Sequence, residues 1–119
     1  MTAPDKLYIA VRADLPAGLV LSQAVHAAIE FALERPEEAR AWRDRSNTVA
    51  VVAADDERAL RELQRDAGIV RTDAVPFFDP DLSPALTAVA LHPGQSAKRL
   101  CRRMPLALSQ RATERRPVA

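Results

Sequence analysis

The order of elements in this chain is indicated by residues 7–54, which read LYIAVRADLPAGLVLSQAVHAAIEFALERPEEARAWRDRSNTVAVVAA. Residues 7–11 are apolar and β-prone, which predicts a buried strand. The apolar spacing then changes to a helical period over residues 19–33. A second short helix is predicted from Pro36, because proline suits a first helical turn and acidic residues follow it. Residues 48–53 form the clearest strand, so a strand, two helices and a strand are expected.

The second half of the chain adds further strands and helices. Asp55 is placed to cap a helix that ends near Ala67, before Gly68. The later predictions are a strand at 69–75, a proline-rich loop at 77–84, a strand at 86–91 and a helix at 96–104. Helical crossovers make the first three strands candidates for parallel neighbours, and the short link into the fourth predicts a mixed sheet. The fold class is therefore α/β, with helices on both faces of the sheet.

Composition and length favour one globular domain. The chain has 119 residues, 48% of them hydrophobic and 28% charged, which suits a single core. No signal peptide is visible, and no window approaches the roughly 18 apolar residues of a membrane helix. The single cysteine, Cys101, excludes an intramolecular disulfide. We therefore expect a cytoplasmic protein with no membrane partner.

Basic residues are concentrated at the C-terminal end. The net charge is +1, yet seven basic residues and one acid, Glu114, follow Gln95. Residues 1–108 are expected to form the domain and residues 109–119 a basic, disordered tail. The charge split favours a polyanionic partner, with a merely solvated tail as the alternative. The residues expected to contact RNA phosphates are Lys98, Arg99, Arg102 and Arg103.

The first long helix carries the most site-like residues. Its period places Leu21, Ala24, Val25, Ala28, Phe31 and Ala32 on one side, predicted to face the core. The opposite side would carry Leu19, Ser22, Gln23, His26 and Glu30. Histidine can act as a base near neutral pH, and glutamine can orient a carbonyl or amide. The alternative is an ordinary solvated helix face, although a leucine on that side suggests a covered surface, a pocket or an interface.

Cofactor and metal sites are not readable in the sequence. There is no nucleotide-binding glycine motif and no cysteine pair, and His26, His92 and Cys101 lack metal-ligand spacing. We therefore expect no metal and no cofactor.

Several motifs resemble those of one family. Val11-Arg12-Ala13-Asp14-Leu15, followed by Gly18-Leu19-Val20-Leu21-Ser22-Gln23-Ala24-Val25-His26-Ala27-Ala28, resembles the signature of the peptidyl-tRNA hydrolase 2 family. Residues 48–52, 55–60 and 86–94 agree with further stretches of that family. The resemblance runs from about Lys6 to about Leu108, which is nearly the whole chain.

The resemblance implies a fold and an activity. The fold is a three-layer α/β/α sandwich with a mixed four-stranded sheet, often dimeric, so a homodimer is among the expected partners. The activity is hydrolysis, without metal, of the ester between a peptide and tRNA. The positions that match the family's site are Arg12, Gly18, Gln23, His26 and Thr87. The family also uses an aspartate before its last strand, and either Asp79 or Asp81 fits that position.

The resemblance has one departure, at Leu19, where the family carries a lysine. Leucine supplies no charge for an oxyanion or a phosphate, and Arg12 would replace it only if its side chain turned toward the same cleft. The expected mechanism uses His26 or an aspartate to position water, with Thr87 and backbone N–H groups as oxyanion donors. Thr87 as a plain strand residue is the alternative at that position. The alternative function is a non-catalytic module that binds tRNA or a protein.

Overall fold

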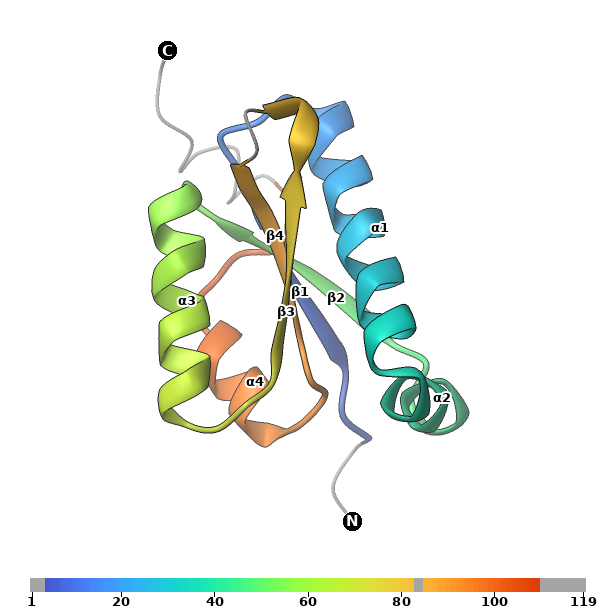
Figure 1. The fold of residues 1–119 in the computed structure, drawn as a ribbon. Helices are drawn as coiled ribbons and strands as arrows, with labels where there is room; N and C mark the ends of the chain where they lie inside the picture. The colour runs from blue at the N-terminus through green and yellow to red at the C-terminus, as the bar shows by residue number, and fades with distance from the viewer. Residues whose placement is uncertain (1–3, 83–84, 110–119) are drawn as a thin grey trace.

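The computed structural model describes residues 4–82 and 85–109, in which strands and helices alternate along the chain (Figure 1). The elements are β1 (Leu7–Arg12), α1 (Ala17–Glu34), α2 (Pro36–Arg45), β2 (Val49–Ala54), α3 (Glu57–Ile69), β3 (Ala74–Asp79), the 3-10 turn η1 (Pro80–Leu82), β4 (Ala85–Leu91) and α4 (Gln95–Cys101). The basic tail predicted at 109–119 falls, from residue 110 onward, outside the described residues.

The strands form one mixed sheet in the order β2-β1-β4-β3. β1 pairs parallel with β2 and antiparallel with β4, and β3 pairs antiparallel with β4. Helix α1 covers one face of the sheet, while α3 and α4 cover the other (Figure 1). The predicted α/β/α sandwich with a mixed four-stranded sheet is confirmed.

Alternation along β1 divides the core into two layers. Leu7, Ile9 and Val11 pack toward α1, whereas Ala10 packs in the layer of α3 and α4. Successive side chains of a strand point to opposite faces, so a strand covered on both sides is apolar throughout. The continuous apolar run that predicted a buried strand follows from this position between two layers.

The third strand lies later in the chain than predicted. Residues 69–75 were expected to form it, but α3 continues to Ile69 and β3 spans Ala74–Asp79, within the expected loop. β3 is an edge strand, and an edge tolerates Pro76 because only one side of the strand needs ladder hydrogen bonds. β3 runs in the same direction as β1 but is separated from it by β4, so the expected parallel neighbour is wrong for this strand.

Two helix ends also differ from the predictions. Asp56, not Asp55, is the N-cap of α3, and its side chain accepts a hydrogen bond from the Ala59 N–H at 2.9 Å. Helix α4 ends at Cys101 rather than near residue 104. In the part of the chain that the structure describes, no helix combines the length and apolarity needed to cross a membrane.

Candidate functional site

A chain of hydrogen bonds joins α1 to the ends of two strands. The Thr87 hydroxyl on β4 donates to Gln23 Oε1 at 2.6 Å, and Gln23 Nε2 donates to Asp79 Oδ2 at 2.7 Å. Thr87 and Gln23 are 0% and 1% exposed, so the first of these bonds is closed to solvent. The Thr87 hydroxyl accordingly fixes which way the Gln23 amide faces, and the amide holds Asp79.

A β-bulge turns Thr87 toward α1. Phe77 pairs with Ala88 and Phe78 pairs with Leu86, so Thr87 is an extra residue of β4 with no partner on β3. Strict alternation from Ala88, which packs in the α1 layer, would send the next side chain to the opposite face. The bulge removes that alternation locally, which is how bulges re-aim side chains near functional sites.

The burial of Gln23 corrects the predicted faces of α1. Gln23 lies in the core with Ala24 and Phe31, while Leu21 and Val25, expected in the core, are 59% and 58% exposed. Hydrophobic periodicity treats glutamine as a surface residue, but Thr87 and Asp79 satisfy both ends of its amide. The helix is therefore rotated from the predicted orientation, and its outward side is apolar.

The two candidate aspartates occupy different positions. Asp79 Oδ2 receives the Gln23 amide, and Asp79 Oδ1 receives the backbone N–H of Asp81 at 2.9 Å. Asp79 is half-buried, whereas Asp81 is exposed in η1 and contributes its backbone to the chain. The geometry brings Asp79, and not the side chain of Asp81, together with Gln23.

His26 lies one turn further along α1 and is exposed. Its ring stacks on Phe77, with ring centroids 4.6 Å apart and planes inclined by 6°. Phe77 and Asp79 lie on the same side of β3, as Gln23 and His26 do on α1. Two contacts, Gln23 with Asp79 and His26 with Phe77, therefore follow each other along the seam between α1 and β3.

Arg12 does not join this seam. It forms a two-point contact with Asp14, both distances being 2.9 Å, and an ion pair with Glu57 of α3 at 3.5 Å. The hydrogen bond to Asp14 raises the pKa of the Arg12 guanidinium above its usual value, so the side chain stays charged. Its pairing with α3 places Arg12 on the sheet face opposite α1, and it does not replace the missing lysine in this structure.

The first turn of α1 lies beside the end of β3 (Figure 1). Pro16, the N-cap residue of this helix, makes no side-chain cap hydrogen bond, so the first backbone N–H groups receive no acceptor from it. A Cβ built on Gly18 would meet nothing within 4 Å, so packing within the domain does not require the glycine. Leu19 is half-buried and packs against the α1 side of the core. An open Gly18 leaves the helix end accessible to a ligand.

The expected RNA-binding residues lie apart from this seam. Lys98 and Arg99 are in α4, Arg102 and Arg103 follow it, and all four are exposed. Lys98 and Arg102 line a groove of about 280 Å³ whose other walls include Lys6 and Tyr8. Sequence reasoning missed Lys6 and Tyr8. Alternation along the first strand could have identified Tyr8 from the sequence, because it places this side chain on the α4 side of β1.

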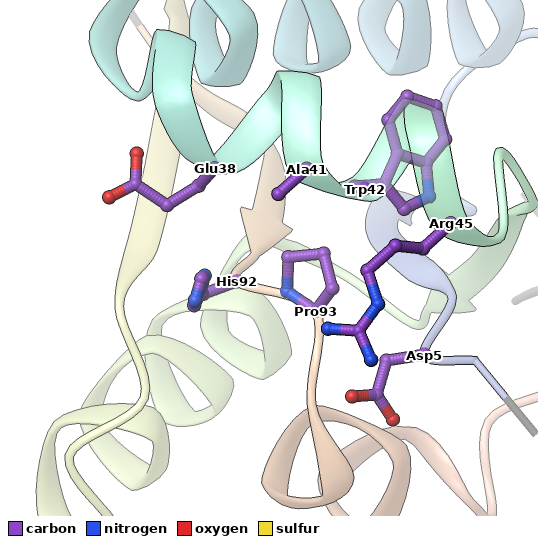
Figure 2. A pocket seen from close by; sticks show the side chains of 7 residues that line it. All are labelled: Asp5, Glu38, Ala41, Trp42, Arg45, His92 and Pro93. Atoms are coloured by element: carbon purple, nitrogen blue, oxygen red, sulfur yellow. The ribbon is translucent and has the colours of Figure 1, made fainter. Parts of the chain in front are cut away.

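A further pocket, of about 250 Å³, lies at the end of the sheet away from Thr87 (Figure 2). Its walls include Trp42 and Arg45 of α2, with His92 and Pro93 after β4. His92 is therefore remote from His26. Among residues 4–82 and 85–109, no three His, Cys, Asp or Glu side chains gather so that they could hold a metal ion.

Comparison with known proteins agrees with this architecture. A solved structure of a protein of unknown function from Agrobacterium tumefaciens strain C58 superposes with a TM-score of 0.66. The match has 11% sequence identity and covers 88% of this chain and 98% of that one, so it shows the fold alone. No curated protein matches this sequence. The family model "Peptidyl-tRNA hydrolase PTH2" matches residues 5–99, most of the chain, and the protein therefore belongs to the peptidyl-tRNA hydrolase PTH2 family.

Proposed function

We propose that this protein hydrolyses the ester bond between tRNA and a peptide or an N-blocked amino acid. Membership of a hydrolase family supports the general reaction. The single observation that carries the proposal is the buried chain from Thr87 through Gln23 to Asp79. Burying an amide and a hydroxyl is unfavourable unless both form hydrogen bonds. Here the hydrogen bonds of Thr87 and Gln23 lead to the half-buried carboxylate of Asp79.

Asp79 is proposed as the general base. N–H groups of Gln23 and Asp81 hold its two oxygens, and each oxygen retains a lone pair that can accept a proton. A water bonded to Asp79 would attack the ester carbonyl carbon, pass its proton to the carboxylate and form a tetrahedral oxyanion. Collapse of that intermediate breaks the bond to the tRNA oxygen, which leaves with a proton from Asp79 or His26.

The first turn of α1 is proposed to stabilise the oxyanion. Its uncapped N–H groups and the positive end of the helix dipole favour a developing negative charge. Thr87, expected as an oxyanion donor, already donates its hydroxyl proton to Gln23 and has no exposed surface. We therefore assign Thr87 a positioning role and leave the donor role to backbone N–H groups near Gly18.

tRNA is proposed to contact the basic groove beside α4. Lys98, Arg102 and Lys6 supply positive charge there, and Tyr8 supplies an aromatic surface. These residues lie away from Asp79, so their contacts would be with phosphates remote from the ester and would carry no base information. A tRNA partner is also consistent with the proposed cytoplasmic location.

The test measures release of the blocked amino acid from N-acetylated aminoacyl-tRNA by the purified protein. Asp79→Asn should reduce turnover strongly, because it removes the base, while Asp81→Asn should retain turnover, because the Asp81 side chain lies outside the hydrogen-bond chain. Circular dichroism should show both variants folded. Equal turnover in wild type and Asp79→Asn would refute the assignment, and loss only in Asp81→Asn would exchange the two roles.

A second candidate function, a non-catalytic module that binds tRNA or a protein, rests on Leu19. Leucine replaces the lysine expected from the family, and Arg12 turns to α3 instead of compensating. The turnover assay separates the two functions when it is run beside a tRNA-binding measurement. Binding with no turnover would favour the module, and turnover above the uncatalysed rate would exclude it.

A further inference from the structure

The two edges of the sheet differ in what covers them. The segment after α4 lies antiparallel to β2, with the Ala53 N–H donating to Pro105 C=O at 2.8 Å. The Ala107 N–H donates to Val51 C=O at 2.9 Å on the same side. At the other edge β3 lies in front of the remaining strands in Figure 1, and in the described part of the chain it pairs with β4 alone. One edge is therefore covered by the chain itself, and the other is open.

The open side of β3 presents a defined set of backbone groups. Just before β3, the Asp73 C=O accepts the His92 N–H at 2.9 Å, so Asp73 directs its backbone groups toward β4. Hydrogen-bonded and non-hydrogen-bonded positions alternate in an antiparallel pair, so Ala74 and Pro76 direct theirs outward. The bulge adds its residue to β4 and not to β3, so the alternation continues to Phe78. The edge thus offers N–H groups at Ala74 and Phe78, and C=O groups at all three positions.

We propose that the peptide of a peptidyl-tRNA binds along this open edge as a fifth strand of the sheet. This inference rests on the proposed function, because its occupant is part of the substrate cleaved beside Asp79. β3 ends at Asp79, so a segment bound along the edge extends to the proposed base. The scissile ester is at the C-terminus of the peptide, so the peptide must run parallel to β3 for that end to reach Asp79. Strand addition takes its affinity from main-chain hydrogen bonds, which peptides of any sequence can form.

Parallel pairing defines which groups of the peptide are bonded. Two peptide residues that are two apart would donate their N–H groups to the C=O groups of Ala74 and Pro76. The carbonyl of the second of these residues would accept the Phe78 N–H. The carbonyl of the first finds no donor, because proline has no N–H. The peptide residue between them directs its backbone groups away from β3. The edge therefore holds a peptide through a short ladder of hydrogen bonds, which permits release after cleavage.

Other occupants fit this edge less well. A permanent strand partner, such as a second copy of the chain, needs a continuous row of donors and acceptors, and Pro76 interrupts that row near its centre. A nucleic acid strand needs cations for its phosphates, whereas β3 has no lysine or arginine and ends on the carboxylate of Asp79. A peptide segment needs neither a complete ladder nor positive charge.

The first test measures kcat/KM for peptidyl-tRNAs of one peptide sequence in which single peptide nitrogens are methylated in turn. Methylation removes an N–H donor, and each lost hydrogen bond to β3 should lower kcat/KM about 2- to 10-fold. The loss should occur at two residues that are two apart, while methylation of the residue between them should leave kcat/KM unchanged. That middle position is the matched control for the bulk of the methyl group. Equal losses at neighbouring residues, or no loss at any residue, would overturn the proposal.

A second measurement does not depend on turnover. The probe is a peptidyl-RNA minihelix in which an amide replaces the ester, and the readout is hydrogen exchange of single backbone amides in the full chain. The probe should slow exchange at Phe78, whereas the same minihelix without a peptide should not. The Ala107 amide, already bonded at the covered edge, should keep its exchange rate.

The outcomes separate this inference from the proposed hydrolysis. Slowed exchange at Phe78 with no turnover of N-acetylated aminoacyl-tRNA would support peptide binding at the edge and refute hydrolysis alone. Turnover with unchanged exchange at Phe78 would overturn the edge proposal and leave hydrolysis intact. Slowed exchange at Phe78 that needs no probe and increases with protein concentration would overturn it in favour of a second copy of the chain.

Discussion

Thr87→Val removes the hydroxyl that orients Gln23 and keeps the branched shape of the side chain. Gln23 Oε1 then stays buried without its donor, which costs about 1–3 kcal/mol. For 119 residues, the usual unfolding entropy makes each kcal/mol worth about 4 °C in Tm. We therefore expect Tm to fall by about 4–12 °C. Thr87→Ser is the matched control, because it keeps the donor and loses one buried methyl, worth about 1 kcal/mol.

The two variants should separate more clearly in turnover. Without its donor the Gln23 amide is no longer fixed, and a misplaced Asp79 should lower kcat about 10- to 100-fold in Thr87→Val. Thr87→Ser should stay close to wild type. The assay is release of the blocked amino acid from N-acetylated aminoacyl-tRNA, measured at saturating substrate below the Tm of every variant.

A double-mutant cycle tests whether Thr87 acts through Asp79. In an Asp79→Asn background the base is already lost, so adding Thr87→Val should lower Tm further but leave the residual rate unchanged. Wild-type kcat in Thr87→Val would refute the positioning role. A fully additive loss of rate in the double variant would show that Thr87 acts by a separate route.

Four further results are expected. Leu19→Lys should raise turnover or tRNA affinity by adding a cation beside the anionic substrate, with about 1 kcal/mol of stability lost because Leu19 is half-buried; no gain in either would exclude a role for that position. Lys98→Gln with Arg102→Gln should lower the salt slope of tRNA binding by about two units, and an unchanged slope would mean that neither cation touches a phosphate. Chelator should leave turnover unchanged, whereas loss restored by added metal would contradict this. Burial raises the pKa of Cys101 to about 12, so its thiol should resist alkylation at pH 8 until the protein unfolds; the proton is held more tightly in the folded state, so this contribution to stability is complete below about pH 9 and declines toward pH 12.

Much of the fold follows from patterns that act within one element. The apolar run of β1 and the helical period of α1 are local, and both elements lie where they were predicted. The third strand was misplaced because Pro76 argues against a strand until its position at the sheet edge is known. Edge or centre is a property of strand order, which no local pattern contains.

The candidate site was predicted in its members but not in its arrangement. Gln23, His26 and Thr87 were named from the signature, yet Gln23 was assigned to the outward side of α1. Its burial depends on partners 64 and 56 residues away, Thr87 and Asp79, which a periodicity argument cannot include. The same long-range bond distinguishes Asp79 from Asp81, a choice that spacing alone left open.

Because of the bulge at Thr87, the site depends on how many residues β4 contains as well as on which residues they are. Deleting Leu86 would pair Phe78 with Thr87, restore an unbroken ladder and leave the apolar composition of β4 almost unchanged. The hydroxyl would then face the layer of α3, on the far side of the sheet from Gln23. A protein of the same fold that lacks this single insertion could keep threonine, glutamine and aspartate in its sequence and still have no connected site.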